Sequence, residues 1–237
     1  MSVEEILPHI YAIRGAYVNI FLIAEEDELA LVDTGLKGYE RAVYRALRGI
    51  ERRPDDIHHI LLTHHHADHV GSLATLKERT QAKAYVHPID APIVAGDQKR
   101  PSANPKSMLG RVLGPIIERL PQNKPPVATA DVLVNEGDTV PVAGGMTVLH
   151  TPGHTLGSIS FLMQGHGGVL FAGDAAANVL GRLGGSPPLF TEDTEAAKAS
   201  IRRLAELEFD TACFGHGRVL KGKATAAFKR FVEKVAR

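Results

Sequence analysis

Short apolar runs alternate with polar turns along the first 33 residues. The segments 9–14, 18–24 and 29–33 are rich in β-branched and other apolar residues and predict three strands. Arg14-Gly15 and the acidic stretch 25–28 separate them. Because the segments between these strands are so short, we expect the three strands to form an antiparallel meander.

Helical and extended patterns then alternate. The segment 38–49 predicts a helix because its apolar residues recur every three or four positions. A buried strand is expected over 57–63, a helix over 70–79 and another strand over 83–87.

The second half repeats this style. Its pattern predicts strands over 131–134, 146–151, 158–163, 169–172 and 211–214, and a closing helix over 225–235. A helix running to Leu207 is expected to begin at Thr191 or Asp193. Two successive halves, each β and then α, predict an α/β protein with two packed sheets and helices on both outer faces.

The segment 97–126 breaks the pattern. It holds six prolines and an apolar helical piece around 108–120, so we interpret it as a loop-helix insertion within one domain, 1–237. Two roles stay open for it: a lid over a substrate, and an insertion that the fold merely tolerates.

Composition narrows the class of protein. With 27 basic and 27 acidic residues the formal net charge is zero, which gives no support for a nucleic-acid partner. The first residues lack a secretory apolar region, and no apolar run approaches the roughly 20 residues of a membrane helix. The single cysteine, Cys213, allows no intramolecular disulfide. We expect a soluble cytoplasmic protein.

The residues most able to carry chemistry lie in the stretch THHHADH, residues 63–69, directly after the apolar run 59–62. His64 and His66 are two residues apart, so in an extended segment both rings lie on one side and can hold one ion. Asp68 and His69 follow as the chain turns towards the next helix. Imidazole and carboxylate ligands suit Zn²⁺, Fe²⁺ or Mn²⁺, and a solvated histidine-rich turn is the ordinary alternative.

Three further predicted strands are each followed by a turn in which a glycine directly precedes a single histidine or aspartate. These residues are His154, Asp174 and His216, in the segments 151–155, 171–174 and 214–217. Each alone would be an ordinary residue. Together with the 63–69 turn they predict a metal site along one edge of stacked sheets.

The chain resembles the metallo-β-lactamase-fold hydrolase superfamily, in particular its small glyoxalase II-like and lactonase-like members. The matching segments are 31–35 (LVDTG), 63–69, 151–155 with Gly157-Ser158, 171–174 and 214–217, in the order typical of that superfamily. The resemblance implies a four-layer αββα sandwich of two mixed sheets with outer helices.

The resemblance also implies two divalent metal ions, usually zinc, with iron or manganese as alternatives. His64, His66 and His154 match the ligands of the first ion. Asp68, His69 and His216 match those of the second, and Asp174 matches the carboxylate that bridges the two. Asp33 matches a residue that orients the ligands by hydrogen bonds without binding metal itself.

The implied activity is hydrolysis of an ester, thioester, lactone or phosphoester of a small molecule by a bridging hydroxide, with Asp68 and Asp174 in catalytic roles. Only 21 residues follow His216, so we expect no C-terminal helical domain of the glyoxalase II type. Two alternatives stay open, a mononuclear iron persulfide dioxygenase and a β-lactamase-type amide hydrolase, although true β-lactamases of this superfamily lack the bridging aspartate. A homodimer is compatible with the resemblance, and the substrate itself is not specified.

Overall fold

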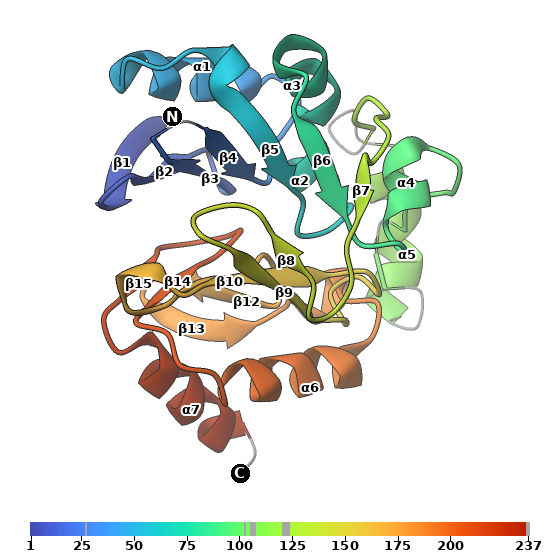
Figure 1. Ribbon diagram of the computed structural model, residues 1–237. Helices are drawn as coiled ribbons and strands as arrows, with labels where there is room; N and C mark the ends of the chain where they lie inside the picture. Colours follow the sequence, from blue (N-terminus) through green and yellow to red (C-terminus); the bar gives the residue numbers. More distant parts are fainter. Residues whose placement is uncertain (27, 102, 105–107, 120–123, 236–237) are drawn as a thin grey trace. The chain divides into compact units, whose positions relative to one another are not determined.

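The computed structural model describes residues 1–237 except 27, 102, 105–107, 120–123 and 236–237 (Figure 1). The chain divides into two compact units. The first comprises Met1–Arg100 and Glu118–Val134, and the second comprises Pro101–Ile117 and Asn135–Arg237. Among the described residues, no helix combines the length and the apolar character that a membrane span requires.

The first unit is built on a seven-stranded mixed sheet in the order β1-β2-β3-β4-β5-β6-β7. Strands β1 to β4 are antiparallel, which confirms the expected meander, and β4 to β7 are parallel. The strands are β1 (Ser2–Leu7), β2 (Ile10–Arg14), β3 (Asn19–Ala24), β4 (Leu29–Val32), β5 (Ile57–Leu61), β6 (Lys83–Val86) and β7 (Val132–Leu133). Strand β1 was not expected, because half of its residues are polar and exposed and leave no clear alternation of apolar and polar positions.

Helices cover one face of this sheet (Figure 1). Helix α1 (Glu40–Gly49) buries Val43 and Leu47 in the core together with Leu31 of β4, as its apolar spacing predicts. A short 3-10 helix, η1 (Pro54–Asp56), and helix α4 (Ala91–Ala95) complete the unit.

The helix expected over 70–79 is corrected to two helices, α2 (Ala67–Val70) and α3 (Leu73–Thr80). The break comes at Gly71, whose N–H donates to the Gly35 carbonyl at 2.8 Å and not to a carbonyl within the helix. A side chain at Gly71 would meet the backbone of Leu36 and Lys37. Close packing against the 33–37 loop therefore ends the first helix one residue after the histidine-rich stretch.

Strand 131–134 was expected to open the second half, and this is also corrected. Strand β7 instead pairs in parallel with β6 at the edge of the first sheet. Asp131 holds it there: its Oδ2 accepts the Ala84 N–H at 2.7 Å and pairs with Lys77 Nζ at 2.6 Å.

The second unit contains a six-stranded mixed sheet in the order β15-β14-β11-β10-β9-β8. Its strands are β8 (Thr139–Val140), β9 (Met146–His150), β10 (Ile159–Met163), β11 (Val169–Phe171), β14 (Thr211–Cys213) and β15 (Leu220–Lys221). Strand β14 pairs in parallel with β11 and antiparallel with β15, and the Cys213 side chain in it is fully buried. Two mixed sheets with helices confirm the expected fold class.

Helices α6 (Thr194–Leu204) and α7 (Ala224–Val235) pack on one face of the second sheet (Figure 1). Asp193 begins α6, because its carboxylate accepts the N–H groups of Glu195 and Ala196, both at 3.0 Å. Phe214 and Phe228 stack in the core beneath, with ring centroids 6.2 Å apart.

The segment 175–190, expected to be a loop, contains a two-stranded hairpin, β12 (Ala176–Val179) and β13 (Arg182–Gly185), and the 3-10 helix η4 (Pro188–Phe190). The hairpin turns at Leu180-Gly181, with φ of 53° and 75°, which suits the right-handed twist of two-residue hairpins. Asn178 ties the hairpin to the segment after His216: its carbonyl accepts the Arg218 N–H at 2.9 Å.

The expected insertion helix is present as α5 (Met108–Glu118) in the second unit. Its outer face exposes Met108, Leu109, Val112 and Ile116. Before the helix, the Asn104 N–H donates to the Leu189 carbonyl at 2.8 Å, which joins the insertion to η4. Its role as a lid stays a prediction.

Candidate metal centre

Asp33 organises the turn that follows β5. Its backbone is left-handed, with φ of 62°, and its carboxylate is 2% exposed. Oδ1 accepts the Thr63 N–H at 2.9 Å, and Oδ2 accepts the Thr63 hydroxyl at 2.8 Å. Oδ2 also faces His69 Nδ1 at 2.8 Å, so the imidazole donates its Nδ1–H to the carboxylate. His69 therefore presents Nε2 as its ligating nitrogen.

The two histidines two residues apart lie together as their spacing predicts. Their rings are 4.8 Å apart and nearly perpendicular, and ligand atoms of His64 lie within 4.8 Å of those of both His66 and His69. His64 Nδ1 lies 3.0 Å from the Thr63 hydroxyl, whose proton is directed to Asp33, so Nδ1–H donates to it. Nε2 of His64 thus carries the lone pair that a metal ion would take.

Asp68 stands beside this group at the start of α2. Its Oδ2 lies 4.0 Å from His69 Nε2, and its side chain is 22% exposed. Burial raises the pKa of Tyr17, and the negative charge of Asp68 raises it further. The phenol of Tyr17, in the β2–β3 turn, is therefore within the electric field of this carboxylate.

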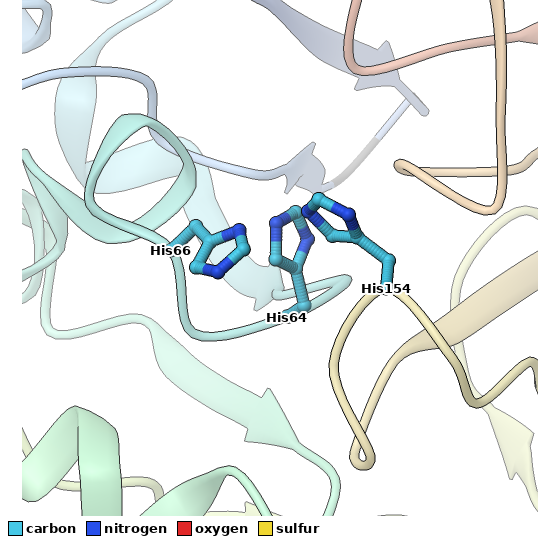
Figure 2. Close-up of side chains that lie close together, drawn as sticks. All are labelled: His64, His66 and His154. Atoms are coloured by element: carbon cyan, nitrogen blue, oxygen red, sulfur yellow. The ribbon is translucent and has the colours of Figure 1, made fainter. Parts of the chain in front are cut away.

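In the second unit the three remaining candidates meet at one carboxylate oxygen. Asp174 Oδ2 lies 3.3 Å from His154 Nε2 and 3.1 Å from His216 Nε2. Asp174 follows β11 through Gly173, which has φ of 52°, and is only 7% exposed. The ends of β9, β11 and β14 thus deliver one candidate ligand each. Figure 2 shows His154 on the loop after β9, and His64 and His66 on the loop after β5.

Ser186 is a partner of His154 that the sequence did not reveal. Its Oγ lies 2.6 Å from His154 Nδ1, and the Thr191 hydroxyl lies 2.8 Å from Ser186 Oγ and 2.7 Å from the Pro187 carbonyl. If Thr191 donates to the carbonyl, Ser186 donates to Thr191 and accepts Nδ1–H from His154. This chain of hydrogen bonds directs His154 Nε2 towards Asp174. A serine in a Gly-Pro-rich segment carries no sequence signal for such a role.

His65 was expected to face away from the metal. It is fully buried, and its Nδ1 lies 3.1 Å from Asp90 Oδ2. Asp90, which precedes α4, was not singled out from the sequence.

The donor set of each unit fits divalent metal ions. Imidazole nitrogens face carboxylate oxygens at side chains that are buried or half-buried, and hydrogen bonds at Nδ1 hold the rings of His64, His69 and His154 with Nε2 available for ligation. Imidazole with carboxylate is the ligand combination of zinc and of related divalent transition metals.

Solved structures with the same fold were found by comparison. A metallo-beta-lactamase family protein, TTHA1429 from Thermus thermophilus, is 25% identical with a TM-score of 0.72 over 98% of this chain and 81% of that one. BJP-1, a subclass B3 metallo-beta-lactamase of Bradyrhizobium japonicum, is 20% identical with a TM-score of 0.72 over 100% of this chain and 94% of that one. The second likeness supports the fold alone.

Sequence relatives agree with the fold. The probable metallo-hydrolase YflN of Bacillus subtilis is 31% identical over 230 residues, 90% of this chain and 86% of that protein. A hydroxyacylglutathione hydrolase of Pseudomonas fluorescens is 33% identical over 156 residues, 65% of this chain but only 44% of that enzyme. Residues 13–216 match the family model described as the metallo-beta-lactamase superfamily. The chain belongs to the metallo-beta-lactamase superfamily.

Proposed function

We propose that this protein is a metal-dependent hydrolase with a dinuclear metal centre. The observation that carries the proposal is the approach of two imidazole Nε2 atoms, from His154 and His216, to the same oxygen of Asp174. A carboxylate that faces two potential ligands in this way suits a bridging position between two cations.

The proposed ligand sets take residues from both halves of the sequence. His64, His66 and His154 would hold the first ion, and Asp68, His69 and His216 would hold the second. Asp174 would bind both ions, and its negative charge would offset the repulsion between them.

When bound, the metal ions would lower the pKa of a coordinated water towards roughly 7 and polarise the scissile bond. The protein supplies orientation and proton transfer. Asp68, the most solvent-accessible acid of the set, accepts a proton at its carboxylate and passes it to the leaving group. Asp33 fixes the Nδ1–H tautomer of His69, and Ser186 fixes that of His154.

The relatives indicate the class of substrate only broadly. The hydroxyacylglutathione hydrolase named above suggests a thioester, although the match covers less than half of that enzyme. We propose a small-molecule ester, thioester, lactone or phosphoester as the substrate. Zinc is the proposed metal, with iron or manganese as alternatives that the same donors accept.

Metal quantification combined with a substrate panel tests the proposal. We expect two zinc ions per chain and turnover on at least one of a thioester, a lactone or a phosphotriester. Asp174→Ala should lower metal content and activity together, while His58→Gln, at an exposed histidine outside the ligand sets, should change neither. If the protein instead held one iron per chain and consumed oxygen when given a persulfide, it would be a dioxygenase and not a hydrolase. Full activity with two metals in Asp174→Ala would contradict the bridging role.

A further inference from the structure

His65 lies between two proposed ligands, and its backbone is held on both sides. Its N–H donates to Asp90 Oδ2 at 2.8 Å. Its carbonyl accepts Nε–H of Arg100 at 2.8 Å. Neither Asp90 nor Arg100 belongs to the proposed ligand sets.

These two hydrogen bonds act on different peptide planes. The N–H of His65 belongs to the planar peptide group that joins His64 to His65, and its carbonyl belongs to the group that joins His65 to His66. When both planes are fixed, φ and ψ of His65 are fixed, and with them the positions of the Cα atoms of His64 and His66 relative to each other. The range of separations open to the two imidazoles is thereby narrowed before any ion arrives.

The side chain of His65 adds a third restraint. Its Nδ1 lies 3.1 Å from the same oxygen of Asp90, and the two side chains are 0% and 1% exposed. The ring of His65 also meets the ring of His66 edge-on, with centroids 4.9 Å apart and an interplanar angle of 78°. His66 therefore packs against a ring that is fully buried.

Burying these charged groups is costly, which argues against incidental placement. Burial lowers the pKa of Arg100, and the nearby charge of Asp90 opposes that shift. Charged side chains withdrawn from water, here the buried Asp90 and the half-buried Arg100, are often no more stabilising than apolar side chains of similar volume. Their value here is geometric, because apolar side chains could not bond to the two peptide groups around His65.

We propose that Asp90 and Arg100 are positioning residues that preset the spacing of His64 and His66 for the first metal ion. This inference rests on the proposed function, because it concerns the affinity of that metal site.

A cobalt titration of the metal-free protein tests it, with affinity measured by competition against a chromophoric chelator and geometry by the visible absorption of bound Co²⁺. Asp90→Ala and Arg100→Met should each weaken binding at one of the two sites by roughly 10- to 100-fold and alter the cobalt spectrum. Asp90→Asn should lose less cobalt affinity than Asp90→Ala, because the asparagine amide oxygen can still accept the His65 N–H.

Asp131→Asn is the matched control. Asp131 also joins a backbone N–H, that of Ala84, to a cationic side chain, that of Lys77, but it touches no proposed ligand. We expect it to lower the thermal midpoint of the metal-free protein and to leave cobalt affinity within about twofold of wild type.

The inference is overturned if Asp90→Ala and Arg100→Met lower the thermal midpoint as the control does but keep the wild-type cobalt affinity and spectrum. If Asp90→Ala does not fold, the cobalt affinities and spectra of Asp90→Asn and Arg100→Met are compared with those of the control and decide the question. A wild-type protein that binds no cobalt would instead refute the proposed function.

Discussion

Replacing Asp33 by asparagine should impair one metal site while leaving the fold intact. The side chain keeps its shape, and asparagine tolerates the left-handed backbone at this position. The amide can lie in two ways. If its NH₂ faced the Thr63 N–H, two donors would oppose each other with no relief. The oxygen therefore stays on Thr63, and the NH₂ faces His69 Nδ1.

His69 then responds by changing tautomer. Its Nδ1 must become the acceptor, which moves the proton to Nε2, the nitrogen proposed to bind metal. A hydrogen bond to a charged group contributes about 1.5–3 kcal/mol, and the variant loses the one between His69 and the carboxylate. At 1.4 kcal/mol for each factor of ten, this predicts a loss of roughly 10- to 150-fold in affinity for the ion that His69 holds.

Competition titration with zinc, together with metal analysis, measures this loss, and urea unfolding of the metal-free protein monitors the fold. Asp33→Ala is the informative comparison, because it removes the bonds to Thr63 as well and should lower stability strongly. If Asp33→Asn bound two zinc ions with wild-type affinities, the assignment of the His69 tautomer to Asp33 would be wrong.

Three further perturbations test other parts of the structure. Gly217→Ala should reduce metal content and the thermal midpoint together, because Gly217 has φ of 89° and an added Cβ would collide with the Asn178 carbonyl beside His216; calorimetry and metal analysis would show this, and a wild-type midpoint would contradict it. Removing zinc with a chelator should lower the free energy of unfolding by about 2.7 kcal/mol for each site, relative to protein in free zinc at 100 times the Kd of that site, and an unchanged value would mean that the folded chain binds no zinc. The N–H of Arg53 donates to the Asp56 carboxylate and holds the pKa of Asp56 below its ordinary value of 3.8. The ionised Asp56 carboxylate therefore stabilises the folded state fully above about pH 4, and this contribution is lost as pH falls through the lowered pKa. In acid titrations followed by circular dichroism, the stability of Asp56→Asn should fall less steeply with pH than that of the wild type.

The parts of the fold that could be predicted are those whose local pattern agrees with their environment. Strand β3 is almost entirely apolar because the core surrounds it, β5 ends in the buried apolar pair Ile60-Leu61, and α1 carries its apolar residues on one buried face. The candidate ligands were identifiable because each follows a largely buried strand, and their roles as metal ligands stay predictions.

The parts that could not be predicted depend on contacts distant in sequence. Hairpin β12–β13 contains Gly184 and Gly185, which weaken any strand signal, and it is held by Asn178 against a segment some 40 residues later. Strand β7 joins the first sheet through the bond of Asp131 to Ala84, 47 residues earlier. Ser186 and Asp90 are ordinary residues by pattern and gain importance only from what they touch.

The buried position of Cys213 has a practical consequence. It is the single thiol of the chain, and it lies in a central strand three residues before His216. A thiol reagent can reach it only when β14 separates from its neighbours, so the rate of labelling reports how often this sheet opens. The native sequence thus supplies its own site-specific probe, without engineered labels, for whether cations slow the breathing of the strand that carries one of their proposed ligands.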